Sequence, residues 1–137
     1  MTFATGELET LISGFQTNPG ASQLSIRQFE MNNFTLPTDF CEFLLRSNGG
    51  EGAIVEKYLV IWSLEELIAM NGAYQVSQYA PAIFLFGSDG AGEGFGFDRR
   101  EDGLPIVALP FIGMNLAAVM RIAPDFASFL RKERLWG

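Results

Sequence analysis

Residues 36–52, LPTDFCEFLLRSNGGEG, describe one helix from its beginning to its end. Pro37 suits a first helical position, where its missing N–H costs nothing, and Asp39 favours the positive end of the helix dipole. The apolar residues recur at the i, i+3, i+4 spacing of a buried face: Phe40, Phe43 and Leu44. The run 48–50, Asn-Gly-Gly, supplies the left-handed conformations that end a helix. The stretch therefore predicts a buried helix that turns sharply into a strand.

Two more helices are predicted before this one. Residues 6–16 carry an apolar stripe at helical spacing, and residues 17–20 break it. The stripe consists of Leu8, Leu11, Ile12 and Phe15. A second helix is predicted over residues 24–32, with Ile26, Phe29 and the following Phe34 turned inward.

Strands are predicted to begin beyond Gly52. Residues 53–55 and 58–62 are β-branched or aromatic runs separated by Glu56 and Lys57, which indicates two strands and a short turn. Trp62 closes the second run and is expected in the core. Ser63 and Glu66 then have the spacing of a capping box. The helix they begin is predicted to reach about Gly72, with its apolar residues inward: Leu64, Leu67 and Ile68.

The second half of the chain predicts more strands and one last helix. An irregular stretch over residues 73–81 leads to a strand over 82–86, and alternation over 93–98 indicates a central strand. In that strand Phe95 and Phe97 share one face, while Gly94 and Gly96 share the other and invite close packing by a ring or backbone. Further strands are predicted over 104–109 and near 117–121. Pro124 starts a helix with apolar Phe126, Phe129 and Leu130, and with basic Arg131, Lys132 and Arg134 near its end.

Helices first, then strands with interspersed helices, predict an α+β fold with a mostly antiparallel sheet. The 137 residues, 48% of them hydrophobic, match one domain with a single core, which we expect to span residues 1–137. The single cysteine, Cys41, lies between Phe40 and Phe43 and is expected to be a small buried thiol.

The net charge of the chain indicates which class of binding partner it favours. Nine basic residues against 16 acidic ones give a net charge of −7, which argues against direct binding of nucleic acid. A basic protein partner fits better, although acidity can also serve solubility alone. The chain shows neither a signal-peptide pattern nor an apolar run of about 20 residues, so we expect a cytoplasmic protein without a membrane segment.

Catalysis is not expected. The absence of histidine removes the usual general base and the Ser-His and Cys-His nucleophile pairs. Carboxylates alone can hydrolyse glycosides, and Asp89, Glu93 and Asp98 are close in sequence, but acidic loops are usually just solvated. The chain is therefore interpreted as a protein that is not an enzyme.

The glycine-rich segment 87–96, GSDGAGEGFG, is interpreted as a tight turn. Its glycines do not match the G-x-G-x-x-G spacing of dinucleotide sites, and no G-K-[ST] follows. Ser88, Asp89 and Glu93 offer oxygen donors for calcium, but alanine and glycine occupy the other positions that a calcium loop needs. We therefore expect neither a cofactor nor a metal.

Taken together, five segments resemble the SMI1/KNR4 family, the core of the SUKH superfamily, over residues 24–131. They are the apolar helix ahead of Leu36-Pro37, LPTDFCEFLL with its NGG, the strand that ends at Trp62 with its capped helix, AIFLFGSDGAGEGFGFD, and APDFASFL. The resemblance implies an α+β domain in which N-terminal helices and a C-terminal helix pack on a central sheet. It also implies, for bacterial members, immunity proteins that neutralise secreted toxins, often nucleases, as in contact-dependent inhibition.

On this resemblance and the charge, we expect a toxin-binding protein whose carboxylates occlude a basic toxin domain. The candidate contacts are acids predicted in turns: Glu51, Asp89, Glu93, Asp98, Glu101 and Asp102. For Arg99 and Arg100, local ion pairs are the expected role. The alternative is a cytosolic regulatory or scaffold module, as the eukaryotic members of the family imply.

Overall fold

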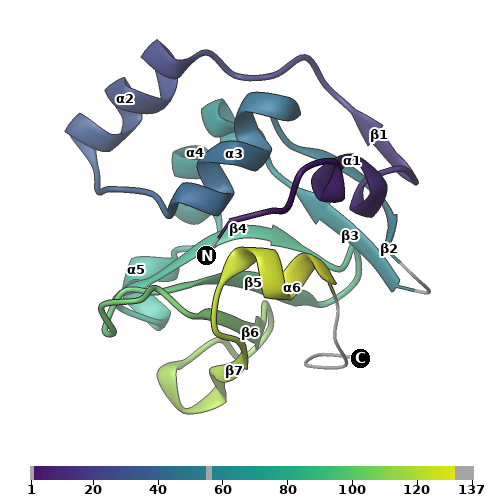
Figure 1. Cartoon of the computed structure of the whole chain (residues 1–137). Helices are drawn as coiled ribbons and strands as arrows, with labels where there is room; N and C mark the ends of the chain where they lie inside the picture. Colours follow the sequence, from purple (N-terminus) through teal and green to yellow (C-terminus); the bar gives the residue numbers. More distant parts are fainter. Residues whose placement is uncertain (1, 55–56, 132–137) are drawn as a thin grey trace.

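The computed structural model describes residues 2–54 and 57–131 and shows an α+β domain built on one seven-stranded antiparallel sheet (Figure 1). The strands follow one another in the sheet in chain order, so each pairs with its neighbours in sequence. They are β1 (Phe15–Thr17), β2 (Gly50–Ile54), β3 (Lys57–Ile61), β4 (Ile83–Ser88), β5 (Glu93–Asp98), β6 (Ile106–Pro110) and β7 (Met120–Ala123). The predictions made for Val55, Glu56, Lys132 and Arg134 lie outside the described residues.

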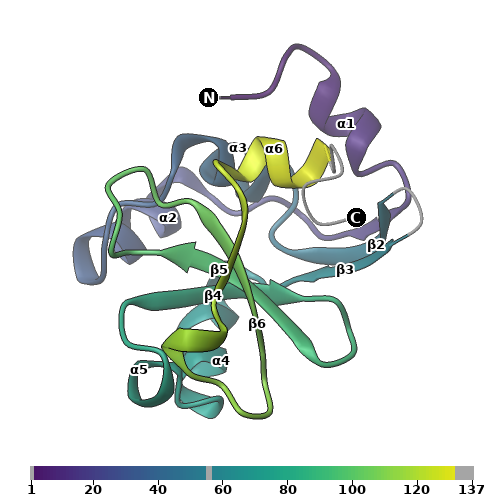
Figure 2. The ribbon, with the colours of Figure 1, turned by 90° about the horizontal axis from the view of Figure 1, so that it is seen from below.

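Helices cover both faces of the sheet. They are α1 (Glu7–Leu11), α2 (Gln23–Asn32), α3 (Thr38–Arg46), α4 (Leu67–Ala73), α5 (Val76–Tyr79) and α6 (Phe126–Arg131), with 3-10 turns η1 (Leu64–Glu66) and η2 (Leu116–Ala118). Figure 2 shows α1, α3 and α6 on one side of the sheet and α4 and α5 on the other. The predicted architecture is thereby confirmed.

A cluster of phenylalanines fills the space between the sheet and helices α3 and α6. Six of these rings are fully buried: Phe40, Phe43, Phe86, Phe97, Phe126 and Phe129. Phe40 is central, with its ring centroid 5.0 Å from that of Phe126 and 5.2 Å from that of Phe97 in edge-on contacts. Burying one such ring stabilises the fold by roughly 1.5–3 kcal/mol. The apolar face predicted for residues 36–52 is therefore the centre of the core.

On the opposite face of the sheet, neighbouring backbone and side chains pack closely on the glycines of β5. A β-carbon at Gly96 would lie 2.4 Å from the carbonyl oxygen of Phe84, and one at Gly94 would lie 2.9 Å from the ring of Phe111. The Phe111 ring stacks on Tyr74 at 4.2 Å, and Tyr74 stacks on Trp62 at 6.3 Å. These contacts confirm the close packing predicted for the two glycines, the interior position of β5 and the buried position of Trp62.

Three local predictions are wrong. The first helix ends at Leu11, and Phe15–Thr17 forms β1, because Phe15 pairs with Gly52 and the sheet supplies the backbone partners. The stretch predicted to be irregular contains α5, which Gln75 begins in a left-handed conformation (φ 54°). Ile68 is half exposed on α4, whereas Leu64 and Leu67 are buried as predicted.

The turn after α3 does more than end a helix. Gly49 and Gly50 have φ angles of 78° and 140°, in the region that the Asn-Gly-Gly run predicts. The Asn48 side-chain oxygen accepts the N–H of Leu64 at 2.8 Å, and its nitrogen donates to Glu65 at 2.7 Å. Asn48 thus holds the start of η1, where Ser63 and Glu66 form the predicted capping box.

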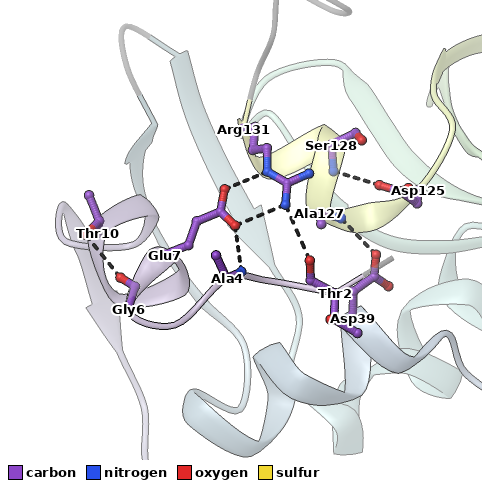
Figure 3. A network of polar contacts seen from close by, with 10 residues as sticks. All are labelled: Thr2, Ala4, Gly6, Glu7, Thr10, Asp39, Asp125, Ala127, Ser128 and Arg131. Atoms are coloured by element: carbon purple, nitrogen blue, oxygen red, sulfur yellow. Dashed lines mark hydrogen bonds and ion pairs between the residues drawn. The ribbon is translucent and has the colours of Figure 1, made fainter.

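The first and last helices are joined by a polar network (Figure 3). Glu7 of α1 accepts two hydrogen bonds from Arg131 of α6, at 2.6 Å from Nε and 3.0 Å from Nη2. Its Oε1 also accepts the N–H of Ala4 at 2.9 Å. The Arg131 guanidinium therefore links two segments 124 residues apart.

Candidate partner-binding surface

The candidate acids divide between the two ends of β5. Glu93 is the first residue of this strand and Asp98 is the last. Asp89 belongs to the β4–β5 hairpin on the Glu93 side, whereas Glu101 and Asp102 belong to the β5–β6 turn on the Asp98 side. The six residues therefore do not form one site.

Arginine balances the acids of the β5–β6 turn. Asp98 is 3% exposed and accepts hydrogen bonds from Arg100, at 2.9 Å from both Nε and Nη2. The Arg100 guanidinium holds the pKa of Asp98 below its ordinary value. Glu101 is exposed and lies 3.4 Å from Arg121, and Asp102 is exposed beside it. This turn offers a partner little uncompensated negative charge.

The two arginines in this turn have different roles. The local ion pair predicted for Arg100 is confirmed by its contacts with Asp98. The Arg99 guanidinium instead lies over the ring of Phe34, with its carbon 4.1 Å from the ring centroid. This cation–π contact joins the β5–β6 turn to the segment after α2.

The tip of the β4–β5 hairpin is a tight turn held by its own side chains. The Asp89 Oδ1 accepts the backbone N–H groups of Ala91 at 2.8 Å and of Glu93 at 3.1 Å. The Ser88 hydroxyl oxygen accepts the N–H of Gly90 at 2.9 Å. Burial raises the pKa of Glu93, and the charge of Asp89 adds to the effect. The turn interpretation is confirmed, and the carboxylates of Asp89 and Glu93 lie close enough for their charges to interact.

The hairpin tip lies against an exposed part of the sheet. A β-carbon at Gly90 would be 3.4 Å from the Tyr58 ring and 3.9 Å from the Val60 side chain. Tyr58 is exposed, and its hydroxyl donates a hydrogen bond to Glu51 on the adjacent strand. That bond raises the pKa of Tyr58. Glu51 and the hairpin tip that carries Asp89 are thus brought to one region by β2, β3 and the hairpin, and Glu93, on the Phe95 side of β5, borders that region.

A groove adjoins this region. It has a volume of about 230 Å³ and lies between β1, β2, β3 and η1. Its lining includes Gln16, Asn18, Gly50, Glu51, Trp62 and Glu66. We define the acidic surface as Glu51, Glu66, Asp89 and Glu93.

Sequence reasoning missed three residues of the groove. Gln16, predicted to be helical, belongs to β1, whereas Asn18 lies directly after that strand, in the break predicted over residues 17–20. Glu66 was interpreted as a capping residue alone. The capping-box spacing identifies its position at a helix start, but no local pattern indicates that Glu51 lies across the groove from that start.

Strand alternation keeps one nearby cation away from the acidic surface. Lys57 is on the same side of β3 as the buried Leu59 and Ile61, whereas Tyr58 and Val60 point to the other side. Glu51, which pairs with Val60 and accepts the Tyr58 hydroxyl, lies on that other side, away from Lys57.

Two further features of the described residues concern metal ligands and the one thiol. Within residues 2–54 and 57–131, no three His, Cys, Asp or Glu side chains gather into a possible metal site. The Cys41 thiol is half-buried, and burial, followed by the charge of Glu30, raises its pKa to about 11. A thiol with this pKa is a poor nucleophile at neutral pH. Over the same residues, every helix is too short or too polar to span a bilayer.

Comparison with known proteins gives one family. Residues 20–132 match the SMI1/KNR4 family (SUKH-1). No curated protein matches the chain significantly. The matched region contains the whole sheet from β2 onward, α2, α3 and α6, and all four residues of the acidic surface.

Proposed function

Because the chain belongs to the SMI1/KNR4 family (SUKH-1), whose members are generally immunity proteins of polymorphic toxin systems, we propose that it binds and neutralises a nuclease-type toxin domain. Family members are typically non-catalytic, and the proposed action is likewise binding without turnover. The toxin domain is blocked because this chain occupies the surface that its nucleic-acid substrate needs.

The observation that carries this proposal is the acidic surface. A nuclease must present lysine and arginine to hold the phosphate backbone of its substrate. Carboxylates held around an uncovered part of a sheet can occupy that basic cleft in place of phosphates. Opposite charges on the two proteins also accelerate their encounter.

The rigidity of the acidic surface favours tight capture. Asp89 is fixed by two backbone N–H groups and Glu51 by Tyr58, so little side-chain freedom is lost on binding. A standard interface buries about 1,600 Å² in total, which four carboxylates alone cannot supply. The exposed Tyr58 and the half-buried Val60 add apolar area between the acids.

The other candidate acids contribute less to this proposal. Asp98 is buried and paired, and Glu101 has its arginine neighbour, so we place neither in the central contact. Asp102 lies at the same end of β5 as these two residues and is assigned no contact. This division defines a control surface on the same molecule.

Coexpression with a nuclease-type toxin domain from a gene adjacent to this one tests the proposal. The wild-type chain is expected to restore growth to cells that express the toxin domain. The double variant Asp89→Asn/Glu93→Gln is expected to lose protection, because it removes two charges from the acidic surface and keeps side-chain oxygens in place. The matched variant Glu101→Gln/Asp102→Asn removes two charges from the other end of β5 and should protect as wild type does.

The outcomes separate binding from steering. If cells die equally with and without the wild-type chain, the immunity function for that pair is wrong. If the wild type protects and both double variants protect equally, the acidic surface is not the contact. Purified proteins are expected to associate several-fold more slowly as salt rises from low to physiological concentration, and salt-independent association would contradict electrostatic steering.

A further inference from the structure

The groove on the acidic surface has a defined chemical preference. The acidic residues Glu51 and Glu66 line it together with Gln16, Asn18 and Trp62, which is 7% exposed. Among the described residues, its lining contains no lysine or arginine. A hollow with this lining favours a cation that can donate several hydrogen bonds.

Existing hydrogen bonds orient the acceptors of the groove. Oε1 of Glu66 accepts the backbone N–H of Ser63 at 3.0 Å and the Ser63 hydroxyl at 3.1 Å. The other carboxylate oxygen of Glu66 takes no part in these two hydrogen bonds. Glu51 similarly receives the Tyr58 hydroxyl on Oε2 and has a second oxygen. Asn18 donates through Nδ2 to the carbonyl of Asn48 at 3.0 Å, which fixes the plane of its amide.

This arrangement suits a guanidinium better than an ammonium. Arginine carries five N–H donors in a plane, so it can reach separate acceptors on two walls, and it stacks on aromatic rings. Lysine presents a compact charge with no flat face to lay on an indole. The groove is lined by separated acceptor-bearing residues and by Trp62.

We propose that this groove binds the side chain of one arginine presented by the toxin domain. The proposal rests on the proposed function, since it names the chemical group that the acidic surface recognises. In the complex, Glu51 and Glu66 accept hydrogen bonds from the guanidinium, and the small exposed part of Trp62 borders it. The arginine would act as an anchor, and the hairpin acids would contact the basic surface around it.

Arginine blocked at both ends, as its N-acetyl methylamide, tests the groove without a toxin. Titration into the labelled protein should shift the amide NMR signals of Gln16 and Glu51 and the indole signal of Trp62. The same compound should alter Trp62 fluorescence. Blocked citrulline has nearly the same shape without the charge, and we expect it to bind at least about tenfold more weakly. Blocked lysine should also bind more weakly than arginine.

Matched variants locate the binding. Glu51→Gln and Glu66→Gln should each weaken arginine binding about tenfold, while glutamine at position 66 still suits a capping box. Asp102→Asn removes one charge from an exposed residue at the far end of β5, outside the groove, and should leave binding unchanged. Thermal unfolding of each variant checks that the fold is intact.

The results distinguish this inference from the proposed function. Equal binding of citrulline or lysine, or arginine binding unchanged by Glu51→Gln and Glu66→Gln, would overturn the arginine site. If that happens while the wild-type chain still protects cells in coexpression, the immunity function stands and the anchor lies elsewhere. Selective arginine binding with loss of protection in Glu51→Gln/Glu66→Gln supports both.

Discussion

The carboxylate of Asp39 accepts the backbone N–H of Ala127, 88 residues later in the chain, at 2.9 Å (Figure 3). Its other oxygen accepts the N–H of Phe40 at 2.8 Å, and the side chain is 2% exposed. Asp39 therefore holds the start of α6 against the start of α3, directly beside the phenylalanine cluster. Burial raises its pKa although both hydrogen bonds oppose the shift.

Replacement of Asp39 should destabilise the fold in a graded way. Asp39→Ala leaves the buried N–H of Ala127 without this acceptor and is expected to cost about 1–3 kcal/mol of unfolding free energy. Asp39→Asn keeps an oxygen and has no charge to desolvate, so it should cost less. Urea unfolding at pH 7 measures the unfolding free energies of both variants. The control is Asp102→Ala at an exposed position, which is expected to lie within about 0.5 kcal/mol of wild type. Equal losses for alanine and asparagine would contradict the role of the oxygen.

The Glu7–Arg131 ion pair predicts that the stability of the fold decreases at acidic pH. The hydrogen bond from Arg131, followed by that from Ala4, lowers the pKa of Glu7 from 4.5 to about 2. Because the folded pKa lies below the unfolded value, the stabilisation is present above about pH 5 and is lost as pH falls toward 2. Glu7→Gln should therefore cost about 1–2 kcal/mol at pH 7 and distinctly less at pH 3.

A second ion pair on the same helix provides the control. Glu9 lies 3.3 Å from Arg46, and both side chains are about half exposed. Glu9→Gln is expected to change stability by less than about 0.5 kcal/mol at either pH, since solvent screens this pair. Thermal unfolding of both variants at the two pH values makes the comparison. If Glu7→Gln and Glu9→Gln have the same pH dependence, the Glu7–Arg131 pair is not the acid-sensitive link.

The glycine face of β5 predicts a steep cost for one added methyl group. At Gly96 a β-carbon would lie 2.4 Å from the Phe84 carbonyl oxygen and 2.8 Å from the Leu85 α-carbon, so two backbones must separate. Gly96→Ala is expected to destabilise the fold by about 2–4 kcal/mol. Gly94→Ala should cost less, because its nearest neighbours are the Phe111 and Leu85 side chains, which can shift.

Gly92 in the preceding hairpin is the matched control. A β-carbon there has no neighbour within 4 Å. Gly92→Ala should be close to neutral in denaturant unfolding. A Gly96→Ala variant as stable as Gly92→Ala would show that β4 and β5 are not packed as tightly as described.

The thiol of Cys41 should react slowly. Its pKa of about 11 leaves a very small thiolate fraction at pH 8, and the thiolate is the reactive form. Alkylation by iodoacetamide should be at least tenfold slower than for a free thiol of pKa about 8.5 at pH 8, and should accelerate up to about pH 11. Mass spectrometry is unambiguous because the chain has one cysteine. Rapid modification at pH 7 would contradict the raised pKa.

Local patterns in the sequence predicted most of the elements. The Asn-Gly-Gly stop, the Ser63–Glu66 capping box and the Phe-Gly alternation of β5 each depend on interactions within a few residues, so they could be recognised without a fold. Phe15 could not be assigned this way. Its spacing from Leu11 and Ile12 fits a helix, and its pairing with Gly52 exists only once the sheet has formed.

The sequence by itself determined the α+β class, the phenylalanine core and the excess of negative charge, because composition and short-range periodicity encode these properties. Tertiary structure decided how that charge is used. The strand β5 separates Asp98, Glu101 and Asp102 from Glu51, Asp89 and Glu93, and arginine compensates two of the first three. Pairing of β2 with β3 and packing of the hairpin tip on Tyr58 bring Glu51 and the hairpin that carries Asp89 together. The physical reason is that electrostatic interactions depend on distances between side chains, and long-range strand pairing sets those distances.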